Sequence, residues 1–172
     1  MQAATLVTVE EYLATSYRPD VEYLEGLILE RHVGEHTHSR AQGLILHFLA
    51  SREREWRIHA VPEQRVQVSA TRFRVPDVCV ILTGSPIEEI YRTPPFLCIE
   101  ILSRDDTMTE MQERVDDYLA MGVAHVWVID PRRCRAYAYT SDGMREIAGN
   151  GALHASGTDI SIPLAAIFDP VE

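Results

Sequence analysis

The sequence has 172 residues and contains no lysine, so all 16 of its Lys-plus-Arg residues are arginine. A compositional bias of the source genome would leave the same pattern without any functional cause. In either case, no role that needs a lysine amine can be filled by this chain.

Cysteine is also scarce, and the three residues present form no even set for a disulfide framework: Cys79, Cys98 and Cys134. This usage is typical of a reduced, cytoplasmic chain with buried thiols. Apolar runs are short, and ATLVTVEEYL near the start has no basic region before a hydrophobic one. We therefore expect a cytoplasmic protein with no transmembrane segment, no secretory signal and no membrane partner.

Positive charge is in deficit, because 26 acidic residues face 16 basic ones and the net charge is −10. An acidic surface repels DNA phosphates, so we expect no broad nucleic-acid footprint. Hydrophobic residues make up 46% of the chain, which is enough to bury a core. The length suits one domain and little more, so we predict a single domain over 1–172.

Local patterns predict a mixed α/β fold class, with a central mixed sheet flanked by helices. Capping boxes at Thr8 and at Thr107 open two helices, and Gly122 can close the second one. A long helix between two buried strands is typical of a crossover that joins parallel strands. We expect long helices at 39–55 and 105–123, and strands or hairpins at 21–31, 58–69, 72–83, 96–103, 125–130 and 135–147.

Two carboxylates stand alone in apolar strands: Asp77 in RVPDVCVIL and Glu100 in PFLCIEILS. If these strands are neighbours, the two side chains can lie side by side, and they repel unless a proton or a cation intervenes. A hard divalent ion such as Mg²⁺ or Mn²⁺, held by carboxylates and a main-chain carbonyl, resolves the repulsion. The alternatives are that Asp77 caps a turn after Pro76, or that Glu100 pairs with an arginine.

An ordered series of motifs carries a resemblance to a known family. Pro76-Asp77, followed by Glu100-Ile101-Leu102, is similar to the PD-(D/E)XK nuclease superfamily. More narrowly, the chain resembles the Uma-type family of "putative restriction endonucleases" over nearly its full length, in EYLEGLILER, VPDVCVI, CIEILS, ERVDDYLAMGVAHVWVIDP and IPLAAIF. The resemblance implies a restriction-endonuclease-like fold.

The resemblance also implies that Asp77 and Glu100 are metal ligands, with the carbonyl of Ile101 as a third. Bound Mg²⁺ or Mn²⁺ would polarise a DNA phosphodiester and help form the attacking hydroxide. The superfamily's lysine ordinarily stands two residues after the glutamate, where this chain has Leu102. In Uma-type relatives that lysine lies on the following helix, at the place that Arg114 holds here.

An arginine at position 114 can stabilise charge on a phosphate that is under attack. It cannot act as a general base at neutral pH, because its pKa is roughly 13. Arg104 is a second candidate for this role. The alternative for Arg114 is a solvated ion pair with Glu110 or Asp117.

Two further side chains are candidates for the site. Leu27 stands where relatives often have a glutamate, so Glu30 is the candidate for an extra acid near the metal. His38 follows Thr37, a candidate helix cap, and faces inward, where it could orient a water, bind the ion, contact phosphate or serve the structure. A zinc cluster is a weaker alternative, built from His32, Glu35, His36 and His38.

Two functions remain open. The first is a divalent-metal-dependent endonuclease acting on DNA, weak or specialised because the lysine is absent. The second is a non-catalytic binding or assembly module that keeps the fold, which the acidic charge and the missing lysine favour. Restriction-type enzymes pair two sites to cut two strands, so we also expect a homodimer, with Trp127 and the 135–147 hairpin as interface candidates.

Overall fold

A six-stranded mixed sheet forms the centre of the protein in a computed structural model that describes residues 6–31 and 35–168. The strand order is β10-β9-β8-β7-β6-β3. Neighbours β7 and β8 run parallel and the other neighbouring pairs antiparallel. The strands are β3 (Ile58–Pro62), β6 (Val78–Leu82), β7 (Leu97–Ile101), β8 (His125–Asp130), β9 (Arg135–Thr140) and β10 (Gly143–Ala148).

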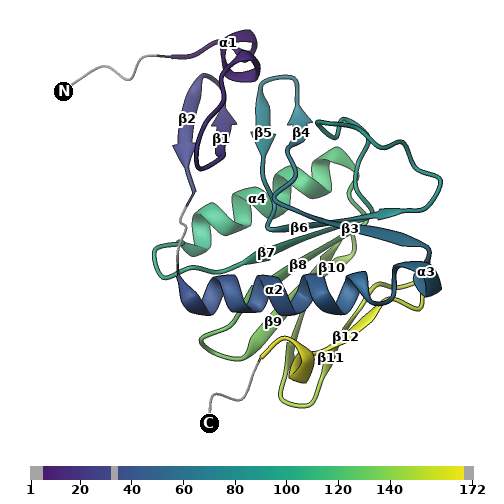
Figure 1. Cartoon of the computed structure of the whole chain (residues 1–172). Coiled ribbons are helices and arrows are strands. Elements are labelled where there is room, and N and C mark those ends of the chain that lie inside the picture. Colours follow the sequence, from purple (N-terminus) through teal and green to yellow (C-terminus); the bar gives the residue numbers. More distant parts are fainter. Residues whose placement is uncertain (1–5, 32–34, 169–172) are drawn as a thin grey trace.

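Helices cover both faces of this sheet (Figure 1). α2 (His36–Ala50) buries Ala41, Ile45 and Leu49 on one face, and α4 (Met108–Met121) buries Met111, Val115 and Tyr118 on the other. Alternate strand residues point to opposite faces of the sheet. β6 therefore supplies Val78 and Val80 to the core on the α2 face, and Cys79 and Ile81 to the core on the α4 face. The central strands are therefore mostly apolar, and Glu100 on β7 is an exception.

A smaller sheet stands beside the central one, with strand order β2-β1-β5-β4 (Figure 1). Its hairpin joins β1 (Val21–Leu24) to β2 (Leu27–Glu30), and Glu25 and Gly26 between them both have positive φ, as a two-residue hairpin turn requires. α1 (Val9–Ala14) covers this sheet, with Tyr12 stacked 5.0 Å from Tyr23. The remaining strands are β4 (Val66–Ser69) and β5 (Arg72–Arg74).

The chain closes with β11 (Ala152–His154), β12 (Ser161–Pro163) and the short 3-10 helix η1 (Leu164–Ala166). Leu153, Ile162 and Leu164 from these elements complete the core on the α2 face of the sheet. Within the described residues, no helix combines the length and apolar character that crossing a bilayer requires.

The predicted crossover is confirmed, since α4 connects the parallel strands β7 and β8. Both capping boxes are confirmed as well: the hydroxyls of Thr8 and Thr107 accept hydrogen bonds from backbone N–H groups in the first turn. Gly122 ends α4 in the left-handed conformation, with φ of 106°. These features depend on short-range contacts, which is why the sequence pattern predicts them.

Several predicted boundaries are wrong. The helix expected at 39–55 begins at His36, with Glu35 rather than Thr37 at its N-cap position, and it ends at Ala50 before a separate α3 (Glu53–Trp56). The strands expected at 58–69 and 72–83 each divide in two. In both cases the chain leaves one sheet and joins the other, which periodicity along a single segment does not reveal.

Trp127 is fully buried in the core beneath α2, so its predicted place at a dimer interface is wrong. The hairpin expected at 135–147 does form, as β9 and β10, and β10 is an edge strand of the central sheet.

Candidate active site

The two lone carboxylates lie side by side at the end of the central strands. β6 pairs with β7 so that Val78 faces Ile99, which sets Asp77, one residue earlier, opposite Glu100. Both residues are buried, with 3% and 4% of their surface exposed. The prediction that they are neighbours is confirmed.

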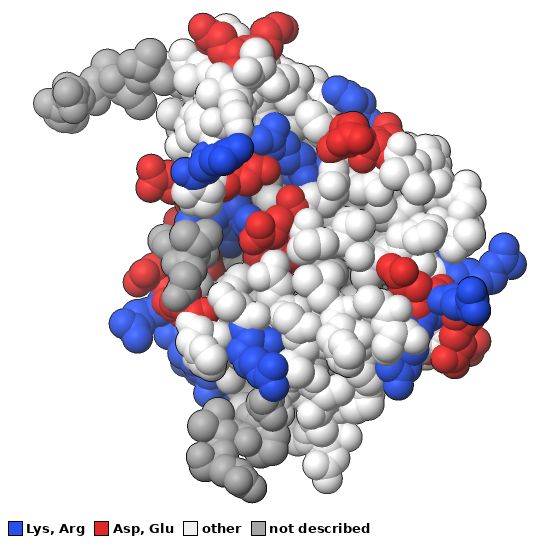
Figure 2. All heavy atoms as spheres, in the orientation of Figure 1, with Lys and Arg blue, Asp and Glu red and all other residues white. Residues whose placement is uncertain are grey.

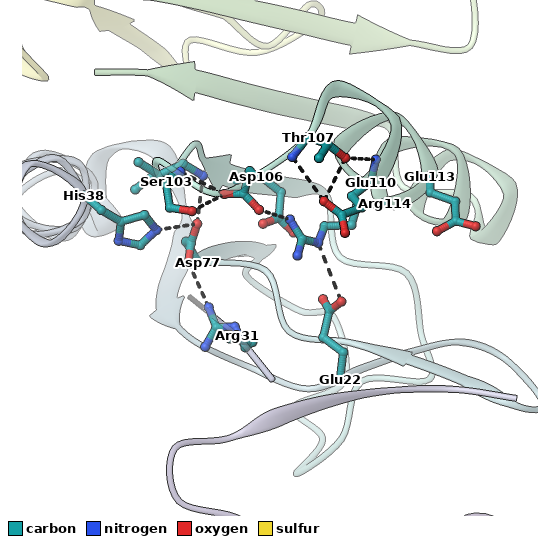
Figure 3. A network of polar contacts seen from close by, with 12 residues as sticks. Glu22, Arg31, His38, Asp77, Ser103, Asp106, Thr107, Glu110, Glu113 and Arg114 are labelled. Atoms are coloured by element: carbon teal, nitrogen blue, oxygen red, sulfur yellow. Dashed lines mark hydrogen bonds and ion pairs between the residues drawn. The ribbon is translucent and has the colours of Figure 1, made fainter. Parts of the chain in front are cut away.

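Asp77 receives donors from three separate elements (Figure 3). Arg31 donates to its Oδ1 at 2.8 Å, while His38 Nε2 and the backbone N–H of Ile101 lie 3.2 and 2.7 Å from its Oδ2. The side chain thus caps no turn after Pro76, and that alternative is wrong. These donors hold the carboxylate facing the N-terminal end of α2.

Glu100 has a different partner. The hydroxyl of Tyr118, from α4, donates to its Oε1 at 2.6 Å. Burial, and then the negative charge of Asp77, raise the pKa of Glu100 to about 8. Glu100 therefore retains a proton at neutral pH unless a positive charge approaches it.

Arg114 bridges two acids beside this pair (Figure 3). Its Nη1 donates to Asp106 Oδ1 at 3.0 Å, and its Nε lies 3.5 Å from Glu22 Oε2. Burial lowers the pKa of Arg114, but the charges of Glu100, Glu22 and Asp106 outweigh that effect and raise it above its usual value. The predicted alternative, an ion pair with Glu110 or Asp117, is wrong because α4 directs Arg114 inward.

Glu22 is one of three charged pocket residues that the sequence reasoning missed, together with Arg31 and Asp106. It is 2% exposed, and it accepts hydrogen bonds from Arg74 Nη1 at 2.8 Å and from the backbone N–H of Val75 at 3.2 Å. The signal was present, because Glu22 is a lone carboxylate in the buried strand β1, as Glu100 is in β7. Glu30, the predicted extra acid, is exposed on β2 and does not line the pocket.

An ion-pair network fixes Glu22 in place. Arg74 is almost fully buried, and its Nε donates to Asp117 Oδ2 on α4 at 2.7 Å. Arg72 contacts the other oxygen of Asp117. Breaking a buried pair of this kind leaves an uncompensated charge, so the network holds the small sheet against α4.

The paired acids Asp77 and Glu100 line a small polar pocket. Its interior volume is about 20 Å³, which leaves room for one water or small ion. Figure 2 shows acidic and basic atoms mixed in the hollow between the β1–β2 hairpin and α2. Four acids meet two arginines and one histidine here: Glu22, Asp77, Glu100, Asp106, Arg31, Arg114 and His38. The acids are in excess, which suits a cation.

A small divalent ion fits this donor set. Among the described residues, no three His, Cys, Asp or Glu side chains form a group that could hold a metal ion. Mg²⁺ does not need three such side chains, since it usually keeps several waters and takes one or two carboxylates. Asp77, Glu100 and the Ile101 carbonyl would supply the protein oxygens, and all three residues line the pocket.

The three histidines considered from the sequence have different positions. His38 lies in the pocket: burial lowers its pKa, but hydrogen bonding to Asp77 and the charge of Asp77 raise it above the ordinary value. His36 is exposed, and His32 lies outside the described residues, so the zinc alternative has no assembled cluster within the described chain. Arg104 does not line this pocket.

A mixed sheet with helices on both faces and paired acids on its central antiparallel strands defines a restriction-endonuclease-like protein. Residues 9–163 match the family described as "Putative restriction endonuclease", Uma2, and the chain belongs to this family.

A solved structure has the same fold. It is "a putative nuclease belonging to DUF820" from Anabaena variabilis, with 22% sequence identity and a TM-score of 0.81. The match covers 94% of this chain and 97% of that one. Among curated proteins, none is significantly similar to the chain.

Proposed function

We propose that this chain is a divalent-metal-dependent endonuclease that hydrolyses DNA phosphodiester bonds, with one nuclease domain over 1–172. The observation that carries the proposal is the buried pair Asp77 and Glu100, in which burial, and then the negative charge of Asp77, raise the pKa of Glu100 to about 8. Membership of a family described as restriction endonucleases supports it.

The chain's own residues have separable roles in this proposal. Asp77, Glu100 and the Ile101 carbonyl would hold Mg²⁺ or Mn²⁺, and the hydrogen bond from Tyr118 orients Glu100. When bound, such an ion polarises the scissile phosphate and lowers the pKa of a water. Arg114 would stabilise the developing negative charge on the phosphate, since its guanidinium faces the pocket.

His38 has the properties of a donor rather than a base. Burial lowers its pKa, but the hydrogen bond to Asp77 and the charge of that carboxylate raise it above the usual value, which favours the protonated form. A protonated imidazole can donate to a phosphate oxygen, whereas it cannot remove a proton from water. Arg31, which also contacts Asp77, adds fixed positive charge on the same side.

The test compares plasmid cleavage by purified protein in Mg²⁺, Mn²⁺ and EDTA. Asp77→Asn and Glu100→Gln are expected to lose at least a hundredfold in rate. Asp142→Asn, which alters an exposed acid in the β9–β10 turn, should cleave as the wild type does. Equal cleavage by the wild type and Asp77→Asn would overturn the proposal.

A non-catalytic module is the second candidate, and one observation favours it. Both oxygens of Asp77 already have donors, from Arg31, His38 and Ile101. Calorimetry with Mn²⁺ separates the two functions, because a module would show no ion binding that depends on Asp77. A homodimer and a cytoplasmic location stay predictions from the sequence.

A further inference from the structure

A second, larger pocket adjoins the candidate active site. It has an interior volume of about 420 Å³ and lies between the β7–α4 loop and the β8–β9 loop. Because β7 and β8 are parallel, their carboxyl ends bring these two loops to the same edge of the sheet. Its lining includes Leu102, Arg104, Asp106, Met108, Arg132 and Arg133.

The two pockets share one lining residue and meet at consecutive residues of the chain. Asp106 lines both of them, and Ile101 in the first is followed directly by Leu102 in the second. A polymer whose reacting group lies at Asp77 and Glu100 would extend into the second pocket.

The arginines of the second pocket have donors to spare. The guanidinium of Arg104 makes no hydrogen bond or ion pair within the described residues. Arg132 is anchored by one bond to the carbonyl of Ser103, which leaves its other N–H groups available. The side chain of Arg133 is 75% exposed, and its contact with Asp130 is long, at 3.9 Å.

The acids of the second pocket are already engaged. Asp106 accepts hydrogen bonds from the backbone and hydroxyl of Ser103 and from Arg114. Asp130 accepts one from the backbone N–H of Arg133. The lining sets three arginines against these two aspartates, so the second pocket presents net positive charge on a chain whose net charge is −10.

We propose that the second pocket binds the DNA backbone next to the scissile phosphate, with Arg104, Arg132 and Arg133 contacting phosphate oxygens. Met108, which is 65% exposed, and Leu102 offer apolar contact to a sugar or base. Arginine suits this task because its planar donors match phosphate oxygens. The inference rests on the proposed function and concerns how that site holds its substrate.

The test measures binding of a fluorescein-labelled DNA duplex by anisotropy at several salt concentrations, with Ca²⁺ present. The combined variant Arg104→Gln, Arg132→Gln, Arg133→Gln is expected to bind at least tenfold more weakly. Each lost phosphate contact should lower the slope of log affinity against log salt by roughly 0.9, so the slope falls by about 2 to 3. The matched control is Arg54→Gln, an exposed arginine on α3, remote from the β7–α4 loop (Figure 1).

Three results would overturn the inference. One is a triple variant that binds with unchanged affinity and salt slope; if cleavage that depends on Asp77 persists, the proposed function still stands. Another is a wild-type protein that binds no duplex even at low salt. The third is a loss of affinity in Arg54→Gln equal to that of the triple variant, since binding would then follow net charge alone.

Discussion

Glu100 sets the charge balance of the candidate active site at the scale of single residues. It is buried beside Asp77, and its pKa is raised to about 8, first by burial and then by that neighbour. Arg114 opposes the shift but does not cancel it. A proton and a divalent ion therefore compete for this carboxylate.

Binding of Mn²⁺ is accordingly expected to strengthen by about tenfold per pH unit between pH 6 and 8, because Glu100 must lose its proton. Calorimetry in buffers of different ionisation enthalpy would show about one proton released per ion. Glu100→Gln should remove this release. Affinity that does not vary with pH would contradict the assignment.

Glu22 offers a matched comparison with Glu30. Glu22→Gln keeps the size of a buried side chain beside Arg114 and Arg74 but removes its charge, so DNA cleavage should fall by at least about tenfold. Glu30→Gln, on the exposed strand β2, should cleave normally. Equal rates for the two variants would remove Glu22 from the site, provided that thermal unfolding shows both are folded.

Arg114 can be tested with two substitutions of different charge. Arg114→Lys keeps a positive charge on α4 and should retain cleavage to within about tenfold. Arg114→Met removes the charge and should cost roughly 10²–10³ in rate, as loss of a charge-stabilising donor does. Equal cleavage by the two variants would exclude Arg114 from this role.

At the scale of elements, α4 is the part that assembles the site. It supplies Tyr118 to Glu100 and Arg114 to Glu22, and Asp117 ties it to Arg74 on β5. Its first turn is fixed by the capping box of Thr107 and Glu110.

Loss of that cap should weaken the protein modestly. Thr107→Ala removes the acceptor for the Glu110 N–H, so the free energy of unfolding should fall by about 1 kcal/mol in urea titrations. Thr109→Ala, also exposed in the first turn but not at the cap position, is the control and should fall much less. Equal effects would mean that the cap contributes nothing measurable.

At the scale of the whole molecule, the raised pKa of Glu100 links stability to pH. The ordinary pKa of a glutamate side chain lies near 4.5 and that of Glu100 in the fold lies near 8, so the folded state binds the proton more tightly. The stabilisation is full below about pH 4.5 and is lost as pH rises through about 8.

Metal-free protein should therefore lose on the order of a few kcal/mol of unfolding free energy between about pH 4.5 and 8, relative to Glu100→Gln. Denaturant titrations in EDTA across this range measure the difference. Added Mn²⁺ should reverse the loss in the wild type alone. Parallel pH profiles for the two proteins would show that Glu100 titrates normally.

Sequence alone determined the features that rest on neighbouring residues. The apolar runs around them singled out Asp77 and Glu100 as lone carboxylates, and the capping boxes and Gly122 marked the helix ends. The crossover followed from a long helix between two buried strands. It places β7 and β8 side by side and parallel. Each feature depends only on hydrophobic periodicity, a helix cap or a turn, and those are local properties of the chain.

Tertiary structure alone decided which charges meet. Glu22 reaches the pocket because β1 pairs with β5, and Arg74 pairs with it from 52 residues away. Trp127 became core because α2 covers its face of the sheet, and Arg114 met Asp106 and Glu22 rather than its helical neighbours. Burial makes such pairings strong, and no local pattern contains the burial that the rest of the chain creates.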